Sequence, residues 1–191
     1  PVRAPGWDWQ QYLPGDRSEL IWSDYHPTSS LPQITNPQSG FVHSANQTPF
    51  TVSAQGDNPR RSEVPETGGW QTRMTNRATR GLELFADFGK ISFDEAWQLK
   101  HDNRYSINYR GMAFLNEVTA LPKSSDEVSQ AIDIFADCDR GTDKGNRGPA
   151  LGVCVLAAEW QAESGGPSSP DAQNTLDDCI DTTLDIGRHL N

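Results

Sequence analysis

The pattern of apolar and polar residues changes near residue 70 of this 191-residue chain. Before that point, short apolar runs alternate with turns rich in Pro, Gly, Asn and Asp, and helical periodicity is absent. Two of the runs, residues 19–25 and 39–45, have turn signals on both sides and predict short strands. We therefore expect an arm of strands and loops over residues 1–70.

Beyond residue 70, pairs of serine and glutamate spaced three residues apart predict helix starts. Ser92 and Glu95 form one such pair, and Ser124 and Glu127 form another. In this capping box the two side chains satisfy backbone N–H groups that the first turn of a helix leaves free. Apolar residues at helical spacing follow both pairs, so we expect a helix after each.

Other stretches of the second part also have helical spacing, and they are residues 76–85, about 107–120, 150–160 and about 170 onward. The run 150–160 is the most apolar of the chain and predicts a buried central helix. The segment 164–171 is rich in Gly, Ser and Pro and predicts a flexible connector inside the helical part. Residues 71–191 should thus contain five or six helices.

These patterns together predict the α+β class. An irregular N-terminal part with a few short strands, residues 1–70, is followed by a mainly α-helical part, residues 71–191. A chain of 191 residues is long enough for one domain with a real core. We expect the two parts to form one structural unit, cut from a larger protein.

Charge excludes some classes of partner. The chain carries 16 basic and 26 acidic residues, a formal net charge of −10. Nucleic acid and anionic membrane surfaces attract clustered Lys and Arg, and the sequence has no basic stripe. No apolar run approaches the roughly 20 residues that a membrane-spanning helix needs. We expect neither nucleic-acid binding nor a membrane span.

The three cysteines, Cys138, Cys154 and Cys179, match no zinc or redox spacing. An odd number leaves at least one thiol free. The cysteines act either as small buried apolar residues on helices or as one disulfide with a free partner left over. The sequence leaves both interpretations open.

Two patterns that resemble metal sites are rejected. Residues 137–146, DCDRGTDKGN, carry Asp at the first, third and seventh positions of a calcium loop, but Gly is missing at the sixth and Gly148 replaces the closing Glu. A polar loop between helices is predicted instead. His26, His43 and His189 lack the spacing of metal ligands.

The stretch NPQSGFVHSANQTPF, residues 36–50, is the candidate for chemistry. A short apolar run ends in two adjacent amides, Asn46 and Gln47, and Pro49 prevents its continuation. The amides either end a strand or hold an amide group at a working position. The motif around them favours the second interpretation.

That motif resembles a segment of penicillin acylase-type enzymes, N-P-x-x-G-[FY]-[IV]-x-x-x-N-[NQ]-x-P. The stretch NRATRGLELFADFGKISFDEAWQLKHDNRYS, residues 76–106, resembles the two helices that follow it in that family. The similarity extends over nearly the whole chain. The family includes penicillin acylases and acyl-homoserine-lactone acylases, and its members are N-terminal nucleophile hydrolases with an αββα sandwich.

The resemblance implies roles for three residues. Asn46 matches the amide that donates to the oxyanion of the tetrahedral intermediate, and Gln47 closes the strand. Arg77 matches an arginine that organises the active site. Asp57 lies eleven residues after Asn46, as does a calcium-binding aspartate of penicillin acylases. No cofactor is required by the resemblance, and structural calcium at Asp57 is implied.

The family's nucleophile, a Ser that begins the larger chain and uses its own α-amine as base, has no match here. We therefore expect an internal fragment of the large chain, inactive alone, whose partners are the small chain, the rest of the large chain and a small N-acyl amide substrate. The resemblance implies a periplasmic or secreted parent. Exposed sheet edges over residues 1–70 predict self-association of the fragment. The alternative function is a non-catalytic helical module that binds other proteins.

Overall fold

The computed structural model describes residues 1–9, 11–54, 56–86, 89–143, 146, 148–163 and 170–189. Most of the predicted connector 164–171 lies outside the described residues. The chain forms two compact units, Pro1–Phe88 and Gly89–Asn191. The change in apolar pattern near residue 70 thus falls inside the first unit, which also contains the first α-helix.

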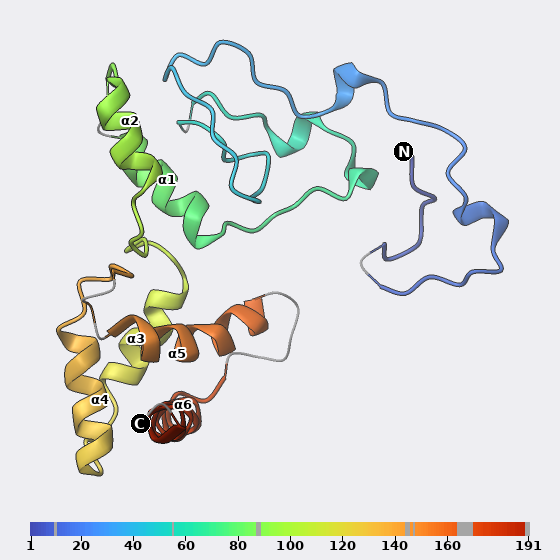
Figure 1. Cartoon of the computed structure of the whole chain (residues 1–191). Coiled ribbons are helices and arrows are strands. Elements are labelled where there is room, and N and C mark those ends of the chain that lie inside the picture. Colours follow the sequence, from blue (N-terminus) through green and yellow to red (C-terminus); the bar gives the residue numbers. More distant parts are fainter. Residues whose placement is uncertain are drawn as a thin grey trace. The chain divides into compact units, whose positions relative to one another are not determined.

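The predicted α+β class is wrong, because the described residues form six α-helices and no strand. Run 19–25 overlaps a 3-10 turn, Ser18–Leu20, and run 39–45 is irregular chain (Figure 1). A strand needs a ladder of backbone hydrogen bonds with a neighbour. Within the described chain each run makes one such bond to a distant segment, to Val2 and to Val52. Turn signals around an apolar run carry no information on whether a neighbouring strand is available to pair with it.

The expected self-association loses its basis in sheet edges, because the described part of the first unit contains none. The αββα sandwich is likewise not seen there. Besides the turn at residues 18–20, three short 3-10 turns interrupt the loops of this unit, at Thr28–Ser30, Arg61–Glu63 and Glu66–Gly68. Self-association itself stays a prediction.

The first unit ends in α1, Asn76–Ala86. Thr75 precedes the helix, and its hydroxyl accepts a hydrogen bond from the Ala78 N–H at 3.2 Å, which satisfies one of the free donors of the first turn. Ala78 is fully buried. One helical face packs against the loop before it, where Phe85 stacks on Phe41 with ring centroids 5.0 Å apart. The segment Asn36–Phe50 therefore packs against α1 through Phe41.

The second unit contains the other helices, which are α2 (Phe93–Lys100), α3 (Gly111–Thr119), α4 (Asp126–Ala136), α5 (Gly148–Glu163) and α6 (Ala172–His189). The capping box of Ser92 and Glu95 is confirmed, with the Ser92 N–H donating to the Glu95 carboxylate at 2.8 Å. Over the described residues, no helix has both the length and the apolar character that crossing a bilayer requires.

The cap of α4 lies one residue later than predicted. Ser125, not Ser124, has the extended backbone of a cap residue, with φ of −144°. Its hydroxyl accepts a hydrogen bond from the Val128 N–H at 3.2 Å. The three-residue spacing to Glu127 selected Ser124, whereas the first turn of the helix begins directly after Ser125, so the predicted cap is wrong by one residue.

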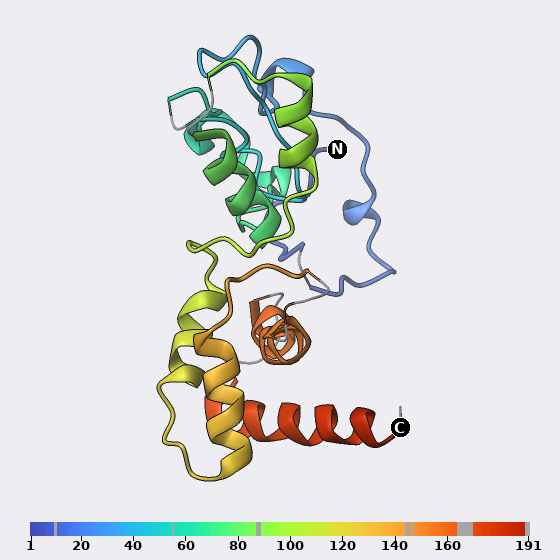
Figure 2. The same ribbon diagram turned by 60° about the vertical axis from the view of Figure 1, so that its left-hand side comes forward.

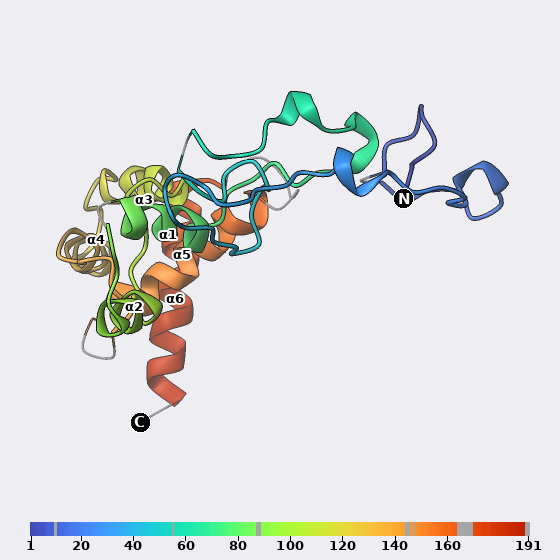
Figure 3. The same ribbon diagram turned by 90° about the horizontal axis from the view of Figure 1, so that it is seen from above.

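Helices α3 to α6 enclose the core of the second unit. Figure 1 looks along α6 and Figure 2 looks along α5, so these two helices cross steeply. Figure 1, Figure 2 and Figure 3 all place α3 and α4 on the same side of α5. The core residues are Phe114, Val118, Val128, Ala131, Ile132, Phe135, Leu151, Val155, Leu176 and Cys179. Each of these four helices contacts the other three, and α5 contributes the buried Leu151, Val155 and Leu156. The predicted burial of this helix is confirmed for one face, whereas Val153 and Trp160 on it are exposed, and all four helices surround the core equally.

Two further links connect these helices. Glu159 of α5 is buried and accepts a hydrogen bond from Arg110 Nε at 2.7 Å, at the start of α3. Cys154 of α5 and Cys179 of α6 form a disulfide, and Cys138 is free. The structure thus supports one disulfide with a leftover thiol, the second of the two interpretations that the sequence left open.

Candidate functional site

Asn46 lies in the turn at the end of the apolar run 39–45. Its backbone φ is +58°, in the left-handed region. Among residues with a Cβ, Asn and Asp adopt this conformation most readily, because their short polar side chains bond locally. The turn therefore selects Asn on backbone grounds alone, and a chemical role needs separate support from the side chain.

The side chain of Asn46 is held by the first turn of α1. Arg77 Nη2 donates a hydrogen bond to Asn46 Oδ1 at 2.7 Å. An amide has one acceptor oxygen and one donor NH₂ group. Because the guanidinium occupies the oxygen end, the NH₂ end of Asn46 is directed away from Arg77. The structure therefore brings together the two residues to which the motif gave a role, 31 positions apart in sequence.

Two more hydrogen bonds attach this turn to the chain that leads into α1. The Thr75 hydroxyl donates to the carbonyl of Ala45 at 2.8 Å. The Thr48 N–H donates to the carbonyl of Arg73 at 3.0 Å, and Thr48 is buried. The residues on both sides of Asn46 are thus fixed to one segment, which limits how far its side chain can move.

His43 and Gln47 fill the inside of the same turn. The two nitrogens of the His43 ring lie 3.2 Å from the carbonyl oxygen of Val52 and 3.0 Å from that of Ala78. Gln47 Oε1 accepts from the Ala45 N–H at 2.7 Å, and Gln47 Nε2 donates to the carbonyl of Thr51 at 2.7 Å. Gln47, predicted to close a strand, instead bridges both sides of a turn.

A family model described as penicillin amidase matches residues 1–182. The chain belongs to the penicillin amidase family. The resemblance read from the motif around Asn46 is thereby confirmed over almost the whole length of the chain. Membership makes the chain part of an acylase-like hydrolase, from a family of multi-chain amide hydrolases that are typically periplasmic or secreted.

Within this penicillin amidase domain, Asp57 holds a loop. Its carboxylate accepts hydrogen bonds from the N–H groups of Gln38 at 3.1 Å and of Ser39 at 2.8 Å. Hydrogen bonds from the Ser39 side chain and from these two N–H groups lower the pKa of Asp57 below its ordinary value of 3.8. The described residues contain no group of three or more His, Cys, Asp and Glu that could hold a metal ion. The role of Asp57 in binding calcium stays a prediction.

The sequence missed His43 and Thr75 as supports of the site. His43 was tested only against the spacing of metal ligands and set aside, and that spacing is the wrong criterion for a ring that binds backbone carbonyls. Thr75 directly precedes a helix, where a threonine commonly caps the first turn, and this signal could have found it. The contacts of His43 with Val52 and Ala78 depend on how the loop folds, so no local signal identifies them.

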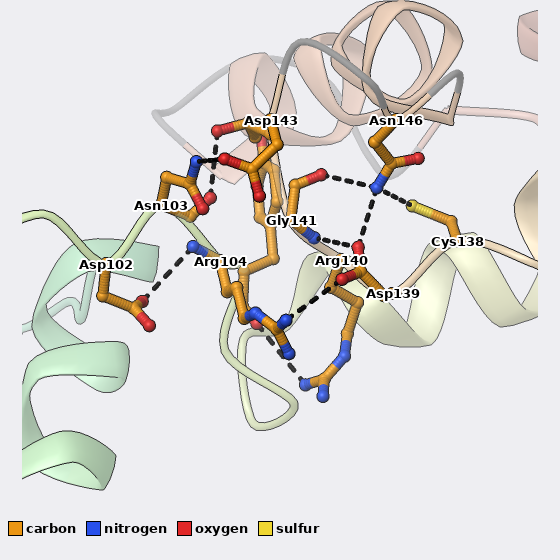
Figure 4. A network of polar contacts seen from close by, with 11 residues as sticks. Asp102, Asn103, Arg104, Cys138, Asp139, Arg140, Gly141, Asp143 and Asn146 are labelled. Atoms are coloured by element: carbon orange, nitrogen blue, oxygen red, sulfur yellow. Dashed lines mark hydrogen bonds and ion pairs between the residues drawn. The ribbon is translucent and has the colours of Figure 1, made fainter.

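A second polar cluster lies in the loop between α4 and α5, residues 137–146 (Figure 4). Arg104 Nη2 donates to Asp139 at 3.1 Å, and Asn103 Nδ2 donates to Asp143 at 2.7 Å. Asn146 Nδ2 lies 2.7 Å from Asp139 and bridges the loop. These carboxylates accept from amides and from a guanidinium of the neighbouring segment. The cluster therefore joins two loops, in agreement with the predicted polar loop between helices.

Proposed function

We propose that this chain supplies the oxyanion-binding part of an N-acyl amide hydrolase. The observation that carries the proposal is the hydrogen bond from Arg77 Nη2 to Asn46 Oδ1 at 2.7 Å, within a turn fixed to α1. A structural amide at a turn needs no guanidinium on its oxygen. A donor that must present its NH₂ group in one direction is stabilised by such a contact.

In this proposal a Ser hydroxyl attacks the amide carbonyl of the substrate, and the serine's own α-amine accepts the proton. The carbonyl π electrons move onto oxygen, and Asn46 Nδ2 donates a hydrogen bond to this oxyanion. Collapse of the intermediate expels the amine, which takes up a proton, and water then hydrolyses the acyl-enzyme. Arg77 draws electron density from the Asn46 carbonyl, which strengthens its N–H groups as donors. Preorganised donors of this kind contribute about 10²–10³ in kcat.

The nucleophilic Ser is supplied, in this proposal, by another part of the enzyme, together with the small chain that builds the acyl pocket. The isolated chain is then inactive by itself. An oxidising compartment for the enzyme is supported by the disulfide between Cys154 and Cys179, since such bonds persist mainly in periplasmic and secreted proteins.

The test replaces Asn46 by Gly in the full-length, matured enzyme. Glycine adopts a positive φ without strain, so Asn46→Gly removes the amide and leaves the turn unstrained. We expect kcat to fall by about 10²–10³ with little change in KM. Asn36→Gly is the matched control, because Asn36 also has a positive φ, of +50°, and should leave kcat within about twofold. Equal kcat for wild type and Asn46→Gly would refute the proposal.

The alternative, a non-catalytic module that binds proteins, is favoured by exposed apolar residues of the first unit. Ile21 is 73%, Trp22 51% and Tyr25 74% exposed. The predicted self-association of the isolated chain can rest on these residues instead of on sheet edges. Sedimentation velocity across a concentration series should show association, and the triple change to Ser at residues 21, 22 and 25 should abolish it. A single, concentration-independent species for the unchanged chain would contradict this prediction.

A further inference from the structure

We propose that His43 is a positioning residue for Asn46: its ring holds the turn that presents the Asn46 NH₂ group against the first turns of α1. The proposal rests on the proposed function of Asn46 as oxyanion donor. His43 touches no reacting atom in this proposal. It acts through the backbone on both sides of Asn46.

The first support is that the His43 ring joins three segments. Its nitrogens lie 3.2 Å from the Val52 carbonyl and 3.0 Å from the Ala78 carbonyl, and its backbone N–H donates to Val52 at 2.9 Å. An imidazole N–H can donate to such a carbonyl oxygen, and a neutral ring satisfies one of the two at a time. The ring thus links the start of the turn to the chain beyond it and to α1.

The second support is the short path from the ring to Asn46. Gln47 Nε2 lies 3.3 and 3.4 Å from the two ring nitrogens of His43. The same Gln47 amide accepts from the Ala45 N–H at 2.7 Å. Ala45 and Gln47 are the immediate neighbours of Asn46, so a shift of the ring moves the peptide groups on both sides of the donor.

The third support comes from α1. Ala78, which accepts from the ring, directly follows Arg77, which donates to Asn46. The ring and the guanidinium therefore hold the turn from the same turn of helix. Both contacts must be kept for the NH₂ group of Asn46 to keep its direction.

The fourth support is that α1 leaves space for the ring at Gly81. A Cβ built on Gly81 would lie 2.7 Å from Cδ2 of His43, closer than real contacts come, and at a tight 3.0 Å from its Nε2. The rings of Phe41 and Phe85 lie edge-on to the imidazole at 6.4 and 6.3 Å between centroids. The ring therefore has one place, bounded by a residue without a side chain on the helix and by two aromatic rings.

The first experiment is a double-mutant cycle in the full-length, matured enzyme, with His43→Leu and Asn46→Gly. A misplacement of about 1 Å at a catalytic group can cost about 10²-fold, so we expect His43→Leu to lower kcat by about 10- to 100-fold and to leave KM within about twofold. In the Asn46→Gly background, His43→Leu should change kcat by less than about twofold, because the donor it positions is gone. His43→Gln, which keeps a side-chain donor, should recover part of the lost kcat.

The second experiment avoids the loss of fold that removal of a ring can cause. Gly81→Ala replaces glycine inside a helix, which by itself favours the helix, and its Cβ displaces the ring. We expect kcat to fall about tenfold, and the melting temperature to fall less than in His43→Leu, because the helix gains propensity and the ring itself is kept. Gly152→Ala in α5 is the matched control, since its Cβ would meet only Phe135, at an ordinary 3.7 Å. This control should leave kcat unchanged.

The outcomes separate the two proposals. If Asn46→Gly lowers kcat but His43→Leu has the same effect in both backgrounds, His43 is not a positioning residue and the oxyanion role stands. Wild-type kcat in both His43→Leu and Gly81→Ala overturns the His43 proposal as well. If Asn46→Gly itself has wild-type kcat, both proposals fall together.

Discussion

The two units of this chain are held together by different means. In the described part of the first unit, the buried side chains are Ala78, Thr48 and Ser53, two of them polar. The second unit buries a cluster of apolar residues from four helices and adds a disulfide. The first is fixed mainly by hydrogen bonds between side chains and backbone, the second by packing.

This difference explains where the candidate site lies. A loop that is fixed by directional hydrogen bonds can hold one amide in one orientation, as the contact between Arg77 and Asn46 shows. A packed helical core resists unfolding but leaves few polar groups for chemistry. We expect changes in the second unit to affect mainly stability and changes in the first to affect mainly the geometry of the site.

The largest expected effect on stability is the loss of the disulfide. Cys154 and Cys179 are 25 residues apart, and closing a loop of this size contributes about 3 kcal/mol. Replacing both by Ala should lower the free energy of unfolding of the second unit by about that amount in a urea titration followed by circular dichroism. Cys138→Ala, at the free thiol, should cost less than about 1 kcal/mol. Equal losses for the two proteins would show that the disulfide contributes nothing.

A slightly smaller effect is expected from two valines on α5. Val155 is fully buried, whereas Val153, two residues earlier on the same helix, is 53% exposed. Val155→Ala removes two buried methyl groups and should cost about 2–3 kcal/mol of unfolding free energy. Val153→Ala should change it by less than about 0.5 kcal/mol. Similar urea midpoints for both variants would contradict the burial of Val155 in the core.

A third and smaller difference in stability is expected between variants of the two adjacent serines before α4. Ser125→Ala removes the cap that accepts from Val128 and should cost about 1 kcal/mol. Ser124→Ala leaves this cap in place and should cost almost nothing. Thermal unfolding of the two variants measures the difference, and a larger loss for Ser124→Ala would restore the cap that the sequence pattern predicted.

The smallest expected effect is the contribution of Asp57 to the pH dependence of stability in the first unit. Hydrogen bonds from Ser39 and Gln38 lower the folded-state pKa of Asp57 below its ordinary value of 3.8. A carboxyl with a depressed pKa stabilises the fold above its unfolded-state pKa, and this contribution is lost as pH falls through the folded-state pKa. When acid unfolding of the chain is followed by tryptophan fluorescence between pH 5 and about pH 2, the unchanged protein should therefore lose more stability than Asp57→Asn does. An identical pH dependence in the two proteins would remove Asp57 as a support of this loop.

Helices were easier to predict than the loops. The spacing of apolar residues and the capping box at Ser92 and Glu95 reflect contacts within a few residues, so the sequence contains the whole signal. The strands predicted over 19–25 and 39–45 failed because a strand depends on a partner that a short apolar run does not specify. The cap predicted at Ser124 was wrong by one residue, because the spacing to Glu127 fits Ser124 whereas the helix begins after Ser125.

The sequence by itself determined the family and the helical character of the second part, because motifs and helix periodicity are local properties of the chain. The roles of Asn46 and Arg77 come from the same motif and stay predictions. Only the tertiary structure decided that Arg77 binds the oxygen end of Asn46, that the His43 ring reaches the Ala78 carbonyl of α1, and that Cys154 pairs with Cys179. These contacts join residues 25 to 35 positions apart. Distances between such residues follow from how the whole chain packs, and no local pattern contains them.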